Sequence, residues 1–491
     1  PELAREAEED PEVARLIRYC GEISGVARHS GVHAAGVVIT PGPLMDYVPL
    51  CFSREKGLTT QFEMKSAEKI GLMKLDVLGL RTVTVLRHAE EMVRRRQPSF
   101  SVEGIPLDDP ATLDLLNRVE TIGVFQLESP GMRDALRKIG VDRFDDVTAA
   151  VAIFRPGSMH MIDLYGENKR RAAEGKPAKD MIPELQDVLG ETHGVIVYQE
   201  QVMEIAHSFA GMSMAEADSL RRAISKKNAR EMESFGAAFI SGARSRGVSE
   251  RKAREIFDHI RHFGEYGFNK SHSVCYAIIA YWTAYLKAHF PGEFMAATMT
   301  SEMGSTERLA ALVAEAGRMG LTVLPPSVND SLVTFDVDRE GRIVYALKAV
   351  KNVGESPALE IVAARNRGGA FTGIQDLACR VESGLNKKVL ESLIIAGALD
   401  SLPGKRSAML ASVDRVLAYA DDMAVNCAPS SMAIMKRQLY ADAGTGIVET
   451  SEKAEKLMHD SMQRTDFIEG ITAFFEKRPP NFPPMPGALQ D

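Results

Sequence analysis

The chain has 491 residues, of which 45% are hydrophobic and 26% charged, a composition typical of a globular protein with several domains. No apolar stretch approaches the roughly 18–20 residues that span a bilayer, so we expect no membrane segment. The formal net charge is −8, but basic residues cluster locally near residues 221–230 and 251–254. The overall charge therefore does not exclude a polyanion partner.

The cysteine spacing indicates the cellular compartment, and the first residue indicates whether the chain is a fragment. Cys20, Cys51, Cys275, Cys379 and Cys427 are far apart in the sequence and form no CxxC pair. This spacing predicts neither a structural zinc site nor a disulfide framework, and it is typical of a reducing cytoplasm. The chain begins at a proline without an initiator Met, from which we expect a fragment of a longer protein.

The predicted elements change in character along the chain. Residues 1–20 predict an acidic helix, and residues 21–80 predict short strands and turns. Long helices are expected from 81 to 325, where apolar residues recur every three or four positions in 200–209, 215–224, 250–262 and 274–289. A β-hairpin follows at 332–337 and 342–347, then short helices with glycine turns to about residue 400, and a helical segment from about 416. The fold class expected is α+β and predominantly helical.

Asp76 lies within an otherwise apolar run, MKLDVLGLRT at residues 73–82. Burying a carboxylate is costly unless it is paired or holds a metal, so Asp76 has two readings. It is either a salt-bridged structural residue or a ligand of Mg²⁺ at the end of a buried strand. Upstream, His29 and His33 lie four residues apart, but the glycines around them argue against a helical metal-binding pair.

A basic segment, DSLRRAISKK at residues 218–227, is a candidate anion site. On a helix, Arg222 and Lys226 share a face, as do Arg221 and Ser225. Successive cations on one face suit the triphosphate of a nucleotide. The alternative is an ordinary solvated face.

A second candidate is the helix start YGFNKSHS at residues 266–273. Ser271 is expected to cap this helix and to leave free N–H groups near Lys270 and His272. Such a start suits a phosphate or a stacked base. The alternative is an ordinary capped helix.

A glycine turn between two helices, AVKNVGESP at residues 349–357, predicts a helix–hairpin–helix unit. Backbone N–H groups at such a turn can hold a DNA phosphate without reading sequence. Asp336 and Asp338 resemble a metal-binding DxD pair, but they run into a hairpin turn, which favours a structural role.

Taken in this order, the motifs resemble the alpha subunit of bacterial DNA polymerase III, in the C family of DNA polymerases. Further stretches that carry the resemblance are RHSGVHAAGVV at 28–38, TQF at 60–62, GVFQLES at 123–129, FRPG at 154–157, VYQEQVM at 197–203, LPP at 324–326 and residues 386–400. The resemblance extends to about residue 415. It implies the end of a thumb at 1–20, the C-terminal part of a polymerase-beta-like palm at 21–85, fingers at 86–328 and tandem helix–hairpin–helix units at 329–415.

The resemblance also implies site residues and partners. Asp76 occupies the position of one of three catalytic aspartates that hold two Mg²⁺ ions, and Lys74 lies two residues away on the same strand face. The residues expected to meet the incoming deoxynucleoside triphosphate are Arg221, Arg222, Lys270 and His272. Those expected to meet DNA are Lys226, Lys227, Lys351, Asn352 and Gly354. The implied partners are primer–template DNA, a sliding clamp and other subunits of the polymerase III holoenzyme, in the bacterial cytoplasm.

The chain departs from the family pattern in two respects. The other two catalytic aspartates and the internal clamp-binding peptide are not found in this sequence, and residues 416–491 are similar to the C-terminal helices of enoyl-CoA hydratases, which suggests a junction near 415–420. We expect a DNA-directed DNA polymerase by family, which adds nucleotides to a primer 3′-hydroxyl. For the isolated chain we expect instead an inactive DNA-binding fragment that uses its fingers and helix–hairpin–helix surfaces.

Overall fold

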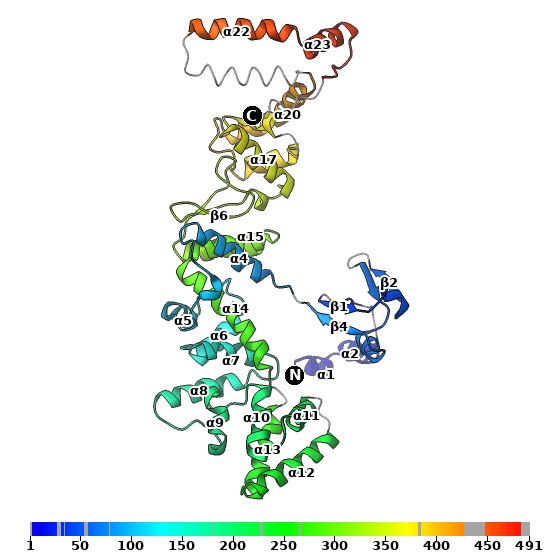
Figure 1. Cartoon of the computed structure of the whole chain (residues 1–491), viewed down its shortest axis with the longest axis vertical. Helices are drawn as coiled ribbons and strands as arrows, with labels where there is room; N and C mark the ends of the chain where they lie inside the picture. The colour runs from blue at the N-terminus through cyan, green and yellow to red at the C-terminus, as the bar shows by residue number, and fades with distance from the viewer. Residues whose placement is uncertain are drawn as a thin grey trace. The chain divides into compact units, whose positions relative to one another are not determined.

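The computed structural model describes residues 2–26, 31–33, 35–53, 57–77, 79–179, 181–225, 229–264, 267–381, 384–426 and 447–482. The chain forms two compact units, which meet in sequence between Arg81 and Thr82 (Figure 1). The described part is mostly helical with a few short strands, so the predominantly helical fold class is confirmed. Among the described residues, no helix combines the length and apolar character needed to cross a bilayer.

In the described part of the first unit there are three α-helices and two antiparallel strand pairs. The helices are α1 (Glu2–Glu9), α2 (Pro11–Ile23) and α3 (Met64–Lys69). Strand β1 (Gly36–Ile39) pairs with β4 (Met73–Asp76), and β2 (Leu50–Ser53) pairs with β3 (Gly57–Thr60). Its small core consists of Val48, Ala67 and Leu72, with Val38, Leu44 and Leu50 packed against them.

The β1–β4 pair has two unlike faces. Val38 packs against the small core, and Lys74 lies opposite Val38 on β4. On the other face, apolar side chains are 42–55% exposed: Val37, Ile39, Met73 and Leu75. Successive residues of a strand point to opposite faces, which explains why one side contacts the core and the other faces solvent.

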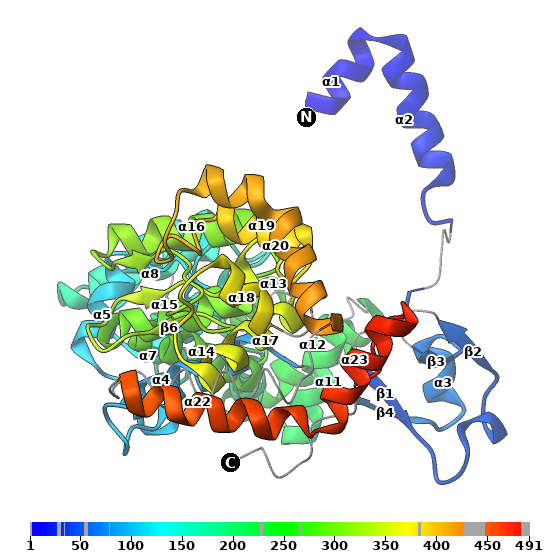
Figure 2. The ribbon, with the colours of Figure 1, turned by 90° about the horizontal axis from the view of Figure 1, so that it is seen from above.

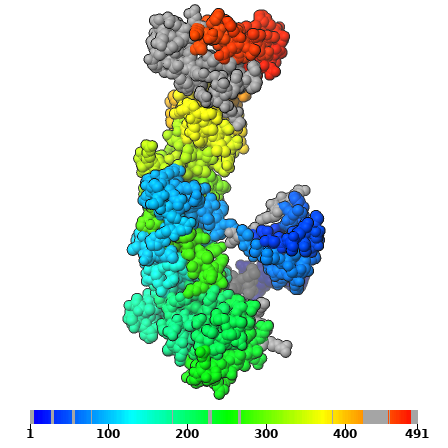
Figure 3. Space-filling view, viewed as in Figure 1, coloured from blue at the N-terminus to red at the C-terminus, as the bar shows by residue number. Residues whose placement is uncertain are grey.

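The second unit begins with a helical body around one large core. Its helices are α4 (Arg81–Arg94), α5 (Pro110–Asn117), α6 (Pro130–Ile139), α7 (Phe144–Ile153), α8 (Met161–Ala173), α14 (Lys270–His289), α15 (Pro291–Ser301) and α16 (Thr306–Arg318). Helix α14 packs against α5, α7 and α15. Fully buried Tyr165, Tyr281 and Phe294 belong to this core. The space-filling view shows these segments in continuous contact (Figure 3).

A second core lies among α9 (Gln186–Leu189), α10 (Gln199–Ala210), α11 (Met214–Ser225), α12 (Ala229–Ser245) and α13 (Glu250–Gly264). Helices α10 and α12 approach closely at Gly242, where an added Cβ would lie 2.0 Å from the carbonyl oxygen of Ala210. A backbone bridge between Tyr198 and Phe268 connects the start of α10 to the segment before α14. This bridge brings residues 70 positions apart in the sequence to one place.

The remaining described segments form a strand cluster and a third core. The expected hairpin is present but short: β6 (Asp336–Val337) pairs antiparallel with β7 (Ile343–Val344), and β5 (Val323–Leu324) pairs parallel with β7. Helices α17 (Glu355–Gly368), α18 (Ile374–Arg380), α19 (Lys387–Ile395) and α20 (Arg406–Asn426) surround the third core. Helices α22 (Ile447–Met462) and α23 (Thr465–Glu476) follow as two consecutive helices set at an angle (Figure 2).

Candidate functional site

Asp76 ends β4 beside Lys74 and His33. Lys74 Nζ lies 3.0 Å from Oδ1 of Asp76, and His33 Nδ1 lies 3.5 Å from the same oxygen. Gly36 is opposite Asp76 in the strand pair, and an added Cβ there would lie 2.8 Å from Cε of Lys74. Glycine at this position therefore makes room for the lysine side chain that pairs with Asp76.

The described residues do not by themselves complete a metal site. Asp76 is 58% exposed at its side chain and is ion-paired with Lys74. The expectation that it ends a buried strand is wrong, because Met73 and Leu75 of β4 are also exposed. Across the described ranges, no group of three or more His, Cys, Asp or Glu side chains is arranged to hold a metal ion. His29 lies outside the described residues, so the expected spacing of His29 and His33 has no counterpart here. The two-metal arrangement implied by the resemblance does not fit the described residues alone.

Arg221 and Arg222 share one carboxylate on α11. Asp218 Oδ1 accepts hydrogen bonds from Nε and Nη2 of Arg221 at 2.9 and 2.7 Å, and its Oδ2 lies 3.0 Å from Nη2 of Arg222. The Arg221 hydrogen bonds hold the pKa of the Asp218 carboxyl below its ordinary value. Lys226 and Lys227 lie outside the described residues. The predicted cationic face therefore includes a carboxylate that already engages two of its cations.

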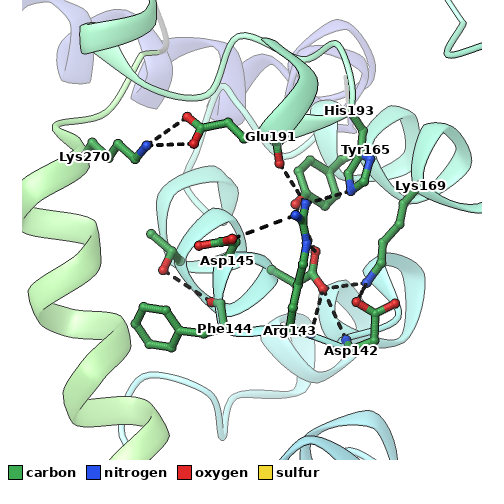
Figure 4. Close-up of polar contacts among 11 residues, drawn as sticks. Asp142, Arg143, Phe144, Asp145, Tyr165, Lys169, Glu191, His193 and Lys270 are labelled. Carbon is green, nitrogen blue, oxygen red and sulfur yellow. Dashed lines mark hydrogen bonds and ion pairs between the residues drawn. The ribbon is translucent and has the colours of Figure 1, made fainter. Parts of the chain in front are cut away.

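Lys270 begins α14 and is held by two glutamates. Its Nζ donates to both carboxylate oxygens of Glu191, at 2.8 and 2.9 Å (Figure 4), and its backbone N–H donates to Oε2 of Glu200 at 3.0 Å. The cap of α14 is Asn269, whose side chain accepts from the N–H of His272 at 2.8 Å. The expectation that Ser271 caps this helix is wrong, because Asn269 reaches the third amide of the helix first. The N–H groups of Lys270 and His272 donate to Glu200 and Asn269, so these two are not the free groups expected near the start of the helix.

Gln199, at the start of α10, connects Arg221 on α11 to the residues just before α14. Its Oε1 accepts from Nη1 of Arg221 at 3.3 Å, and its Nε2 donates to the carbonyl of Gly267 at 3.1 Å. Its backbone N–H donates to the carbonyl of Phe268 at 2.9 Å. Gly267 fits because a Cβ there would lie 3.3 Å from both N and Cγ of Gln199. Gln199 lies in the VYQEQVM stretch but was not predicted as a site residue, since its spacing to Arg221 carries no sequence signal.

A buried polar cluster lies behind Glu191. Arg143 Nη2 donates to the backbone carbonyl of Glu191 at 2.7 Å and lies 3.0 Å from Nε2 of His193. Asp146, fully buried, accepts from the hydroxyl of Tyr165 at 3.0 Å and from Nζ of Lys169 at 2.5 Å. Figure 4 shows Arg143, Tyr165, Lys169 and His193 converging from the residue before α7, from α8 and from the segment before α10.

Among the pKa values that this cluster shifts are those of Asp146 and His193. Burial raises the pKa of Asp146, but the hydrogen bond and charge of Lys169 outweigh burial, so this pKa lies below its ordinary value. Burial and the charge of Arg143 lower the pKa of His193. His193 therefore adds no positive charge beside Arg143. The Arg143 guanidinium contacts both the His193 ring and the backbone carbonyl of Glu191, and so supports the position of Glu191.

The helix–hairpin–helix turn lies between residue 350 and α17. Asn352 adopts a left-handed conformation, φ 66°, and its Nδ2 donates to Oγ of Ser392 on α19 at 3.0 Å. Gly354 is the N-cap of α17. Glycine has no side chain, so it does not cap the helix through a side-chain hydrogen bond. Lys351 is exposed beside it. Three of the five residues predicted to meet DNA thus lie on one turn, which Asn352 links to α19.

Three family models match the chain. The model for the bacterial DNA polymerase III alpha NTPase domain matches residues 1–79, the one for the alpha subunit finger domain matches 82–247, and the helix-hairpin-helix motif matches 320–409. The chain is 43% identical over 435 residues to DNA polymerase III subunit alpha of Escherichia coli (strain K12), which covers 86% of this chain and 38% of that protein.

Two further relatives extend the comparison. The Thermus aquaticus subunit alpha is 44% identical over 427 residues, 86% of this chain and 35% of its own length. The Haemophilus influenzae subunit alpha is 40% identical over 479 residues, 95% of this chain and 41% of its own length. The chain spans about two-fifths of the length of the curated relatives it matches. The resemblance of residues 416–491 to enoyl-CoA hydratases has no support in these comparisons, and the 95% coverage extends past residue 415.

Proposed function

We propose that this chain is part of the alpha subunit of a bacterial DNA polymerase III, and that it contributes to template-directed addition of deoxynucleotides to a primer 3′-hydroxyl. The similarity at 40–44% identity over most of the chain supports this assignment. The observation that carries it is the connection made by Gln199, which links Arg221 on α11 to the segment that begins α14. In this proposal, the cations expected to meet a triphosphate would belong to one face.

The cations on that face are already bound to carboxylates, which an incoming triphosphate could replace. Arg221 and Arg222 are engaged by Asp218, and Lys270 is engaged by Glu191. A triphosphate presents more negative charge than a single carboxylate, and charge-assisted hydrogen bonds to phosphate oxygens are strong. An arriving triphosphate would take over these donors, while His272, exposed on the first turn of α14, would lie alongside it.

The first unit would supply part of the polymerase-beta-like palm, at about residues 21–85. Asp76 would be one of the Mg²⁺ ligands and Lys74 its neighbour in the cleft. When bound, Mg²⁺ activates an attacking oxygen and stabilises developing charge on phosphate. Because the described residues offer no complete set of ligands, we assign no catalytic step to Asp76 and propose that the isolated chain binds DNA without extending it.

The fingers would occupy about residues 86–328, and the helix–hairpin–helix units about 329–415. Backbone contacts at Lys351, Asn352 and Gly354 would hold DNA phosphates independently of sequence. Lys226 and Lys227 would extend the cationic face of α11. In the bacterial cytoplasm, the complete subunit would work with a sliding clamp and other holoenzyme subunits.

Binding of a fluorescent deoxynucleoside triphosphate by the purified 491-residue chain, with a DNA primer–template present, tests the proposal. The double variant Arg221→Ala/Arg222→Ala should bind the nucleotide at least tenfold more weakly. The matched control is Arg254→Ala on α13, which also removes an exposed arginine paired with a carboxylate within its own helix. Equal nucleotide affinity of the double variant and the control would contradict the proposed face.

Primer–template binding at two salt concentrations tests the DNA contacts. Release of counterions from DNA makes phosphate-mediated binding fall steeply as salt increases. We expect such a fall, and no Mg²⁺-dependent primer extension by this chain. Binding that is insensitive to salt would contradict phosphate contacts, and extension would contradict an inactive fragment.

A further inference from the structure

Side chains from three segments meet at α14, and of these only His272 also belongs to the proposed nucleotide face. The loop at residues 154–157 contributes Arg155, and the loop at residues 123–129 contributes Phe125. Helix α14 and the residues before it contribute Phe268, His272 and Tyr276, which are four positions apart. Within α14 that spacing places His272 and Tyr276 on one side of the helix, and Phe268 lies two residues before the helix begins.

These five side chains form a continuous line. The Arg155 guanidinium carbon lies 4.2 Å from the ring centroid of Phe268, a cation–π distance. The rings of Phe268 and His272 are 5.4 Å apart, and those of His272 and Tyr276 stack at 4.5 Å with 29° between their planes. Tyr276 lies 5.5 Å from Phe125. The line thus runs from a cation at one end to an aromatic loop at the other.

The line reaches the surface. His272 is exposed, and Phe125, Phe268 and Tyr276 are half-buried rather than enclosed in the core. The next residue along the loop, Gln126, is also exposed and adopts φ 61°, a left-handed conformation unusual outside glycine.

The loop holds Gln126 in this conformation through buried hydroxyls. Thr121 Oγ1 donates to the carbonyl of Leu127 at 2.6 Å, and Thr283 Oγ1 accepts from the N–H of Phe125 at 3.1 Å. Strained residues that the surrounding structure enforces occur preferentially at ligand sites. Here the enforced residue is exposed and follows Phe125 directly in the loop.

We propose that Arg155, Phe268, His272, Tyr276, Phe125 and Gln126 form a stacking surface for bases of single-stranded DNA. Aromatic side chains accept any base because every base has a π-face, and a neighbouring arginine adds attraction to the bases and phosphates. The amide of Gln126 can both donate to and accept from a base edge. The surface deepens the proposed function, on which it rests, by assigning the unpaired template strand to a place beside the proposed triphosphate contacts.

The test compares two strands that differ only in their bases. The affinity of the full chain is measured for a fluorescently labelled oligothymidylate and for an abasic strand of equal length and charge. We expect the oligothymidylate to bind more tightly. Loss of base–aromatic stacking weakens binding roughly 5- to 150-fold per base. The variants Tyr276→Leu and Phe125→Leu should therefore reduce oligothymidylate affinity toward that of the abasic strand.

A matched variant separates stacking on bases from general packing. Phe209→Leu removes a half-buried ring that stacks on Phe239 in the α10–α13 core, at 5.9 Å, and it should leave the preference for bases unchanged. Circular dichroism and thermal melting identify any variant that fails to fold. His272 is left intact because it also belongs to the proposed nucleotide face.

The outcomes distinguish this proposal from the one on which it rests. Equal affinity of the native chain for both strands, or folded Tyr276→Leu and Phe125→Leu variants that retain the base preference, would overturn the stacking surface and leave DNA binding intact. Variants that lose nucleotide affinity but keep the base preference would assign these rings to the nucleotide instead, which also overturns it. Binding of neither strand would contradict the proposed function itself.

Discussion

The ammonium of Lys270 lies between the two carboxylate oxygens of Glu191, and the backbone carbonyl of Glu191 accepts a hydrogen bond from Arg143. Glu191 therefore reaches Lys270 from a position that the buried cluster of Asp146, Tyr165 and Lys169 supports. A triphosphate that binds Lys270 would compete with this carboxylate for the N–H donors of the ammonium. The same relationship holds on α11, where Asp218 engages Arg221 and Arg222.

Replacing Glu191 by glutamine should strengthen triphosphate binding, because the substitution removes the competing negative charge and keeps the shape of the side chain. Half-exposed ion pairs are weak, so we expect a gain of up to about fivefold in affinity. Titration with a fluorescent triphosphate measures it. Glu204→Gln, at another carboxylate lining the same surface groove as Glu191 and Lys270, is the control and should have no effect. A weaker affinity of Glu191→Gln would show that the carboxylate helps the nucleotide to bind.

Replacing Asp146 by alanine should destabilise the second unit by about 3–5 kcal/mol, because it removes the fully buried partner of Lys169 and leaves that lysine only the exposed carboxylate of Asp142. Urea denaturation at pH 7 measures the loss. Asp145→Ala, at the neighbouring exposed carboxylate 3.8 Å from Arg143, is the control and should cost under about 1 kcal/mol. Similar losses for both variants would contradict the assigned burial.

The Asp146 contribution should also depend on pH. Its pKa is below the ordinary value in the folded chain, so the folded state binds fewer protons at this group than the unfolded state. The stabilisation is therefore fully present above about pH 4, the ordinary pKa of an aspartate, and is lost as pH falls through the folded value. Urea midpoints of the native chain and of Asp146→Asn should converge in acid. A difference that stays constant down to pH 3 would contradict this linkage.

Replacing Gly242 by alanine should destabilise the α10–α12 contact by about 1–3 kcal/mol, because the new Cβ meets the backbone of Ala210 and not a movable side chain. Gly317→Ala on α16, where an added Cβ meets nothing within 4 Å, should instead be neutral or stabilise by up to about 1 kcal/mol. Thermal melting of both variants makes the comparison. Equal effects would contradict the close approach of the two helices.

Replacing Asn352 by alanine should destabilise the protein more than replacing it by glycine. Alanine disfavours φ 66° and lacks the amide that bonds to Ser392, whereas glycine loses only that hydrogen bond. We expect Asn352→Ala to cost about 1–2 kcal/mol more than Asn352→Gly. Urea denaturation gives stability, and primer–template titration shows whether the turn still binds DNA. Equal stability of the two variants would contradict the left-handed conformation.

The sequence predicted the long helices well because their apolar spacing is a property of neighbouring residues. The helix expected at 250–262 is α13, Glu250–Gly264. The sequence did not predict the partners of the site residues, because Glu191 and Lys270 are 79 positions apart and are brought together only by the fold. The cap of α14 was misjudged because Asn269 and Ser271 are both good caps, and only backbone geometry selects Asn269. Lys74 and Asp76 were predictable as neighbours, since alternation along one strand is local.

The two faces of the β1–β4 pair have a practical consequence for handling the protein. A pair of short strands is marginally stable alone, and Val37, Ile39, Met73 and Leu75 leave an apolar surface open to solvent. Such a surface favours self-association at high concentration. Because its strands are short and its core is small, the first unit should also unfold at a lower denaturant concentration than the second. Proteases should then remove it early. A resistant product that begins near Thr82 would then be the material of choice for crystallising the helical unit.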